Sequence, residues 1–229
     1  MRVLAIDTSA GTSVAVVESS GASVRVLGEA SVESTMKHAE SIGQAIADAL
    51  AQANSAPGAS ATGTSAPIRG IDAVVVGRGP APFTGLRVGI AAAIMFAEGL
   101  RLPLFGVVSH DAVALAEFES DLALPATQEL LVTSDARRNE VYWATYSSIN
   151  EHGMPLRTAG PAVQKPAELE AALAQADRQV VSASRAVKAA DIAKVFFAKQ
   201  ASGCAERDVS ALYLRAPDAV PTAAKKVSG

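Results

Sequence analysis

The chain has 229 residues, a hydrophobic content of 49%, a mean hydropathy of +0.24 and a formal net charge of −3. This composition excludes an intrinsically disordered protein. The net negative charge, with no run of lysines and arginines, argues against a protein that binds nucleic acid by itself. The single cysteine, Cys204, excludes an internal disulfide. The N-terminus is unlike a signal peptide, and we expect no segment that crosses a membrane. Together these observations predict a cytoplasmic protein.

Short apolar runs alternate with helical patterns along the chain. Two runs, 3–6 and 14–17, flank a polar turn and predict a β-hairpin. A run at 73–76, a helical pattern at 84–100 and a run at 104–108 predict a parallel strand–helix–strand crossover, and therefore an α/β layer. The other expected elements are strands at 23–30, 130–133, 140–146, 179–182 and 211–214, and helices at 37–53, 109 or 111 to 118, 166–176 and 189–199.

The predicted helix at 84–100 is the most informative element, because Arg87 and Glu98 are its only charged residues. A helix that is apolar on nearly every side must be covered on nearly every side, by a second layer of the same chain or by another protein. Small residues recur at every fourth position and let another backbone approach closely; they are Gly85, Gly89, Ala93 and Ala97. Packing against the chain's own sheet and packing against a partner both explain this stripe.

The predicted helix at 37–53 is amphipathic. Its apolar face consists of Ile42, Ile46, Ala49, Leu50 and Ala53. Beside that face runs a second stripe of small residues, formed by Ala39, Gly43 and Ala47. The segment 54–67 is rich in glycine, serine, alanine and proline without periodicity, so we expect a flexible surface loop there.

The order of elements divides the chain into two α/β halves, 1–108 and 109–216, followed by a loose tail at 217–229. A strand, an aspartate turn and a second strand occur in both halves, at Asp7 and at Asp135. This repetition hints that the halves are related.

No residue pattern indicates a catalytic, cofactor or metal site. Actin-like ATPases place an Asp-x-Gly turn in each half, whereas Asp7 opens Asp-Thr-Ser and Asp135 opens Asp-Ala-Arg. The glycine turn after residue 76 contains two prolines, which lack the N–H groups that a phosphate needs. The three histidines are too widely spaced for a zinc pair, and Cys204 has no obvious neighbouring base.

Five segments, in the same order along nearly the whole chain, resemble one protein family. They are LAIDTSAGTSVAVV at the start, KHAES at the first helix, GPAPFTGLRVG in the middle, DARRNEVYWATY later and ALYLRAPDA near the end. The family is TsaB, also called YeaZ, the bacterial partner of TsaD. The chain departs from the family's usual GPGSFTG at Ala81 and Pro82 and from its HSE at Ala39, and residues 54–67 look like an insertion.

The resemblance implies an actin-like, ribonuclease H-like (ASKHA) fold of two related α/β halves. It also implies a role in forming threonylcarbamoyladenosine beside the anticodon of tRNAs that read codons starting with A. In that pathway TsaD carries the transfer chemistry, TsaE is an ATPase, and TsaB is the platform that TsaD needs. Members of the family also self-associate through their helices.

We therefore expect a non-catalytic scaffold subunit without a cofactor of its own. It pairs with TsaD, joins TsaE in a larger complex, meets tRNA only through that complex and forms a homodimer when alone. The expected partner interface consists of the two small stripes, Ala39, Gly43, Ala47, Gly85, Gly89, Ala93 and Ala97. The alternatives are an actin-like ATPase or kinase that acts on its own, which a calorimetric titration with ATP and magnesium would reveal, and direct binding of tRNA.

Overall fold

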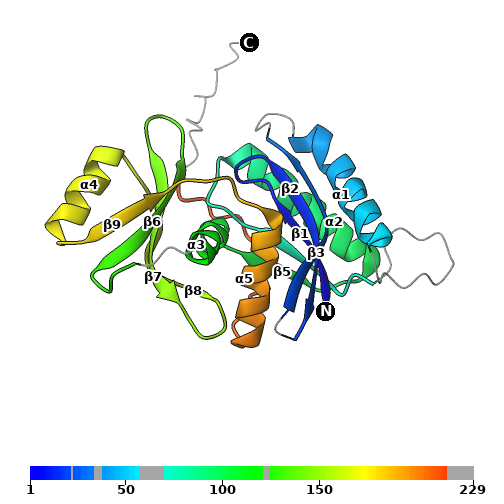
Figure 1. Ribbon diagram of the computed structural model, residues 1–229. Coiled ribbons are helices and arrows are strands. Elements are labelled where there is room, and N and C mark those ends of the chain that lie inside the picture. The colour runs from blue at the N-terminus through cyan, green and yellow to red at the C-terminus, as the bar shows by residue number, and fades with distance from the viewer. Residues whose placement is uncertain (22, 34–37, 57–69, 121–123, 216–229) are drawn as a thin grey trace, which may run out of the picture.

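The computed structural model describes residues 1–21, 23–33, 38–56, 70–120 and 124–215. Figure 1 shows two β-sheets side by side, each with helices packed on it. The elements in chain order are β1 (Arg2–Asp7), β2 (Thr12–Ser20), β3 (Ser23–Val32), α1 (His38–Ser55), β4 (Ala73–Gly77), α2 (Phe83–Leu100), β5 (Leu104–Val107), α3 (Ser109–Glu119), β6 (Gln128–Asp135), β7 (Val141–Ile149), β8 (Pro155–Gln164), α4 (Pro166–Gln175), β9 (Gln179–Ala183) and α5 (Ala189–Ala201).

The first sheet has the strand order β3-β2-β1-β4-β5. β1 pairs antiparallel with β2, as the hairpin prediction required, and parallel with β4, which pairs parallel with β5. The crossover from β4 through α2 to β5 therefore confirms the predicted α/β layer. The central strands are continuous apolar runs because helices cover both faces of this sheet.

Side chains of successive residues along β1 and β4 point to opposite faces of the first sheet. Leu4, Ile6, Val74 and Val76 pack against α1 and α2 on one face. Residues that alternate with these pack against α5 on the other face, among them Val3, Ala5, Ala73 and Val75. Figure 1 shows α1 and α2 together on the side of this sheet that faces away from α5.

The second sheet has the strand order β8-β7-β6-β9 and a smaller core. Its inner face packs against α3, through Val113 and Ala114 of the helix and Leu130, Val132 and Tyr146 of the strands. Its outer face carries α4, through Leu169 and Leu173. In Figure 1, α3 and α5 lie between the two sheets.

The two halves repeat one arrangement, which confirms the predicted fold class. Three antiparallel strands, a helix and a strand parallel to the first make up β1-β2-β3-α1-β4, and the same sequence of elements makes up β6-β7-β8-α4-β9. The packing does not follow the predicted division at residue 108, because α5, from the later part of the chain, completes the core of the first sheet.

The predicted strands differ from the structure in two places: one strand was missed, and one predicted strand is wrong. β8 was not predicted, because Gly160 and Pro161 interrupt its pattern; an edge strand tolerates them, and Gly160 adopts φ 79° where the register with β7 shifts. The predicted strand at 211–214 has no strand partner: Tyr213 N donates to the carbonyl of Ala211 within the segment itself. The predicted loop at 54–67 overlaps the end of α1, and its remainder from residue 57, like the tail at 217–229, lies outside the described residues.

Candidate partner interface

The small stripe of α2 faces the chain's own sheet. Gly89, Ala93 and Ala97 are buried, and the two alanines belong to the core that joins α1 and α2 to β1 and β4. A Cβ added at Gly89 would lie 2.2 Å from Oγ1 of Thr8, which is far closer than any real contact. The expectation that Gly89, Ala93 and Ala97 form an open surface for a partner is therefore wrong, because the close approach they permit is used by Thr8 and the sheet.

Thr8 also fixes the start of α2. Its Oγ1 donates a hydrogen bond to the carbonyl of Gly85 over 2.9 Å. A Cβ at Gly85 would lie 2.7 Å from Nε2 of His38, so this half-buried glycine lets the first turns of α1 and α2 approach each other. Both helical glycines thus have a reason in the protein's own packing that offsets their cost of about 1 kcal/mol each relative to alanine.

The opposite face of α2 is exposed. Met95 is 73% exposed and Ile94 is 38% exposed, on a helix whose other side is fully packed. The exposed positions follow the helical period and form one face, which we call the outer face of α2: Thr84, Arg87, Ala91, Ile94, Met95 and Glu98. By length and mean hydropathy, 1.4 over 18 residues, α2 could cross a membrane, although the sequence was expected to contain no such segment. Only 22% of this window is buried, so much of its apolar character lies outside the stripe that packs on the first sheet.

On α1 the small stripe does reach solvent. Ala39, Gly43 and Ala47 are exposed, and a Cβ added at Gly43 would meet nothing within 4 Å. The buried side chains of this helix, such as Ala49 and Leu50, point into the core. Its acidic side chains are exposed as well, so α1 offers a narrow and slightly acidic surface beside the outer face of α2.

A cleft of about 590 Å³ opens at the N-terminal ends of α1 and α2, opposite the turn between β6 and β7. It is lined by Ala10, His38, Ala39, Pro82, Thr84, Gly85, Val88, Asp135 and Arg137. This is where an actin-like fold would be searched for nucleotide phosphates. The residues do not suit a phosphate. Pro80 and Pro82, in the turn before α2, have no N–H groups to donate to it, and the charge of Arg137 is already paired with Asp135.

Asp7, the aspartate of the first hairpin, does not line this cleft. It is 1% exposed, and its carboxylate accepts hydrogen bonds from Ser9 N (2.8 Å), Ser9 Oγ (2.5 Å) and Ser109 Oγ (2.7 Å). Burial raises the pKa of this carboxyl above its usual value, against the opposing effect of the two serines. Gly77 makes room for it, since a Cβ there would coincide with the carboxylate. Asp7 therefore ties the hairpin to the start of α3.

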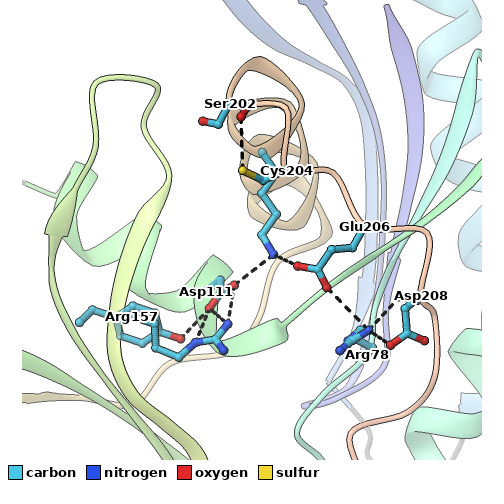
Figure 2. A network of polar contacts seen from close by, with 9 residues as sticks. Arg78, Asp111, Arg157, Ser202, Cys204, Glu206 and Asp208 are labelled. Atoms are coloured by element: carbon cyan, nitrogen blue, oxygen red, sulfur yellow. Dashed lines mark hydrogen bonds and ion pairs between the residues drawn. The ribbon is translucent and has the colours of Figure 1, made fainter.

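A network of charges with a buried centre joins the two halves (Figure 2). Asp111 is its centre: Arg157 binds both of its carboxylate oxygens, at 2.6 and 2.9 Å, and the hydroxyl of Tyr146 donates over 2.8 Å. Lys199 of α5 lies 3.8 Å from the same carboxylate and donates to Glu206 over 2.9 Å. Burial raises the pKa of Tyr146 well above its usual value, and the charge of Asp111 and the hydrogen bond to it add to this effect.

The network continues into an irregular segment at 204–215, which we call the strap. Arg78, in the turn before α2, binds both the carbonyl and the carboxylate of Asp208 and lies 3.9 Å from Glu206. Its own carbonyl accepts from Leu212 N over 2.9 Å. The pKa of Asp208 falls to about 2, chiefly through hydrogen bonds from Ser210 and then Arg78. The strap thus crosses the turn that opens α2.

At its far end the strap touches α2 itself. The ring of Tyr213 lies 4.8 Å from that of Phe83, and its hydroxyl accepts a hydrogen bond from Arg87 Nε over 2.8 Å. The guanidinium of Arg87 lies 5.4 Å from the centre of the same ring. Arg215 then contacts Glu140 and the carbonyl of Ala136 in the second half. The sequence predicted a strand at 211–214 and not a segment that ties α2 to the second half. Tyr213 and Arg215 were the residues that could have indicated these contacts.

Other candidate chemistry is scattered. Among the described residues, no group of three histidine, cysteine, aspartate or glutamate side chains could hold a metal ion. His38 is buried against Thr12, with 3.1 Å between Nδ1 and Oγ1, while His110 is buried beside Ser134, with 2.8 Å between Nε2 and Oγ. Cys204 is exposed, with its thiol 3.3 Å from the carbonyl of Ser202.

Comparison with known proteins places the chain in a family. The model of the family described as TsaD, tRNA N6-adenosine threonylcarbamoyltransferase, matches residues 32–213. The uncharacterized protein ML0378 of Mycobacterium leprae is 37% identical over 169 residues, which cover 73% of this chain and 40% of that protein. The tRNA threonylcarbamoyladenosine biosynthesis protein TsaB of Escherichia coli K12 is 33% identical over 163 residues, which cover 71% of this chain and 65% of that protein. The chain therefore spans less than two thirds of the length of these two relatives.

The fold agrees with this placement. A crystal structure from Pseudomonas aeruginosa, described as an uncharacterized protein with similarity to the peptidase YeaZ, superposes with a TM-score of 0.69 at 25% identity, and the match covers 93% of this chain and 99% of that one. Together with the repeated α/β halves, these matches confirm the resemblance drawn from the sequence. The chain belongs to the TsaD family and, within it, to the TsaB (YeaZ) group.

Proposed function

We propose that this chain is a non-catalytic scaffold and activator subunit of the complex that forms threonylcarbamoyladenosine in tRNAs reading codons that start with A. The proposal rests on the family and on one observation, the exposed apolar outer face of α2 beside the exposed small stripe of α1. A surface of this kind on a folded chain is typical of a site that another protein covers. TsaD is the proposed partner, with TsaE joining the larger complex, and a second copy covers the surface when TsaD is absent.

The chemistry of the cleft supports the non-catalytic part of the proposal. Asp7 is held away from the cleft by three hydrogen bonds, and the turn before α2 offers prolines where phosphate-binding N–H groups would be needed. The strap supports the scaffold part, because it fixes the first turn of α2 to both halves of the molecule. A rigid helix presents a partner surface without the entropy cost of ordering it on binding.

The decisive experiment mixes the purified chain with TsaD from the same organism. Calorimetry measures the affinity, and a tRNA modification assay is run with TsaD, TsaE and the other pathway enzymes, with and without this chain. We expect binding, and modification only when the chain is present. A chain that hydrolyses ATP alone, or modification at full rate without it, would contradict the proposal.

A single substitution tests the surface itself. Met95→Glu places a charge at the most exposed apolar position of the outer face and should weaken TsaD binding at least tenfold, as expected when a central apolar contact is lost. Leu156→Glu is the matched control, because Leu156 is an exposed apolar side chain on β8 of the second sheet. It should bind TsaD like the wild type. Equal binding by both variants would remove α2 from the interface.

A further inference from the structure

The cleft at the N-terminal ends of α1 and α2 has walls from both halves of the chain. One wall consists of the start of α2, and the other is the turn between β6 and β7, which contributes Asp135 and Arg137. A cleft between two packed bodies widens or narrows when the bodies rotate relative to each other. Its width is therefore set by whatever contacts both walls.

The strap reaches the first wall through an aromatic residue. The ring of Tyr213 lies 4.8 Å from that of Phe83, in the first turn of α2, and its hydroxyl accepts a hydrogen bond from Nε of Arg87 over 2.8 Å. One residue earlier, Leu212 N donates to the carbonyl of Arg78 over 2.9 Å. Residues 212 and 213 are therefore fixed to the start of α2 and to the turn before it.

Two residues further on, the strap reaches the second wall. Arg215 donates through one terminal nitrogen to the carbonyl of Ala136 over 3.2 Å and through the other to the carboxylate of Glu140 over 2.5 Å. Its side chain is only 18% exposed, so the loss of this arginine would leave a shielded carboxylate without its partner. Ala136 N donates to the carbonyl of Glu140 and closes the turn that holds Asp135 and Arg137. Arg215 thus holds the turn as a unit.

The connection between the walls is short. Only one residue separates Tyr213 from Arg215, and two residues of extended chain span at most about 7 Å. The walls cannot move further apart than this segment allows unless the contact at one end breaks. The segments behind the walls also meet at Tyr142, whose hydroxyl donates to the carbonyl of Ala81 over 3.4 Å, which is longer than an ordinary O–H···O bond. The strap is therefore the stronger of these two connections.

We propose that residues 213–215 are a clasp that holds the two walls of the cleft at a fixed separation. A ligand between two lobes holds them together only by contacting both walls better in the closed arrangement than in the open one. The clasp supplies such contacts from the chain itself, so the width of the cleft does not depend on a bound ligand. The inference concerns this chain alone and does not rest on its pairing with TsaD.

A distance across the molecule tests the clasp. Figure 1 shows α1 and α4 at opposite ends of the molecule, and Ala47 of α1 and Ala172 of α4 are exposed. Both are replaced by spin-labelled cysteine in a Cys204→Ser background. The labelled chain is diluted with unlabelled chain, so that pulsed electron–electron double resonance measures distances within one molecule. Arg215→Met should lengthen the mean distance by at least about 4 Å, because the walls are then no longer limited to the span of two residues.

The two ends of the clasp should act in series. Tyr213→Ala should lengthen the distance less than Arg215→Met, because Leu212 still holds the strap to Arg78. In the Arg215→Met background it should add nothing, because the connection between the walls is already broken. Arg215→Lys keeps the charge and should stay closer to the wild type than Arg215→Met does.

Lys194→Met is the matched control. Lys194 forms ion pairs with Glu119 at the end of α3 and with Asp191 of α5, and it does not line the cleft. Its side chain is 30% exposed, so this substitution also removes a partly shielded charge between elements. The distance between the labels should remain that of the wild type, since neither wall loses a contact.

The proposal is overturned if Arg215→Met leaves the distance distribution unchanged, or if Lys194→Met lengthens the distance as much. Additive effects of Tyr213→Ala and Arg215→Met would also overturn it, because they would indicate two independent contacts and not one connection. Thermal unfolding verifies that each variant is folded. If Arg215→Met does not fold, Glu140→Gln weakens the same contact and should lengthen the distance in the same direction.

Discussion

At the scale of single residues, Thr8 decides where α2 can lie. Its hydroxyl bonds the carbonyl of Gly85, and its side chain fills the space beside Gly89. Glycine at position 89 is thus required by a contact and not by the helix, which would prefer alanine. The small stripe of α2, which suggested a partner, is explained at Gly89 by this contact within the chain.

Gly89→Ala should therefore destabilise the protein by about 1 to 3 kcal/mol, although it improves helix propensity, because the new Cβ must displace Thr8. Gly43→Ala, also within a helix but with open space around it, should stabilise by about 0.5 to 1 kcal/mol. Urea unfolding measures both. Thr8→Ala should recover part of the loss in the Gly89→Ala background, and equal stability of the two alanine variants would show that Thr8 does not restrict the helix.

His110 predicts a pH dependence. Burial lowers its pKa from 6.5 to about 3, and the positive charge of Arg157 adds to that effect. Between pH 6.5 and about 3 the ring is protonated in the unfolded chain and neutral in the folded chain. Its contribution to the free energy of unfolding is therefore complete above pH 6.5 and is lost as the pH falls toward 3. Each pH unit below 6.5 costs about 1.4 kcal/mol.

His110→Gln keeps a polar group beside Ser134 without a titrating ring. Between about pH 7.5 and about pH 5.5 its free energy of unfolding should fall by about 1 kcal/mol less than that of the wild type. His152→Gln, which replaces an exposed histidine, should leave the wild-type dependence in place. Parallel curves for wild type and His110→Gln would mean that the buried ring does not resist protonation.

At the scale of elements, the strap is the part that the sequence disguised. Residues 211–214 have the composition of a strand, but Leu212 N donates to the carbonyl of Arg78 and the ring of Tyr213 packs against that of Phe83 in α2. The side chain of Arg78 is 12% exposed and binds Asp208 through one terminal nitrogen. Lys199 and Arg215 hold the two ends of the strap, and Arg78 holds its middle through Asp208 and Leu212, so the middle should open locally when Arg78 is lost.

Arg78→Met retains the apolar stem and removes the charge. The amide of Leu212 should then exchange its hydrogen at least about fivefold faster, while amides of β1 keep their protection. Arg25→Met removes an ion pair to Glu18 from an arginine that is 52% exposed, and should change neither. Unchanged exchange at Leu212 in Arg78→Met would show that the other contacts of the strap hold it without the charge of Arg78.

At the scale of the whole molecule, the two halves of the sequence are not the two halves of the structure. Phe196 and Ile192 of α5 are buried against the first sheet, although they follow the second sheet in the chain. The Asp111 network then links α5 to the strands of the second half. The first sheet therefore does not keep its full core without α5, a helix from the later part of the sequence.

A fragment of residues 1–108 should therefore show no cooperative unfolding transition, because one face of its sheet loses the apolar cover of α5. Joining residues 187–215 to it through a flexible linker should restore a transition. Circular dichroism in increasing urea measures the unfolding of the short fragment and of the joined chain. Cooperative unfolding of the short fragment would show that α5 is dispensable for the first sheet.

Much of the fold could be predicted because local patterns carried it. The hairpin around Asp7, the crossover through α2 and the apolar face of α1 all follow from periodicity. β8 could not be predicted, since an edge strand with Gly160 has no clean alternation. The candidate site was predicted in part: the α1 stripe is exposed, but which side of α2 faces out depends on Thr8, a contact between distant residues that no local pattern encodes.

The place of α5 also sets the order in which the protein can mature as it is synthesised. The strands of the first sheet leave the ribosome early, yet the helix that seals one of their faces is made after the entire second sheet. During that interval the apolar side chains of Val3, Ala73 and Val75 are not covered by α5. A nascent chain with such an uncovered surface is prone to aggregation, and α5 is the element whose arrival covers it.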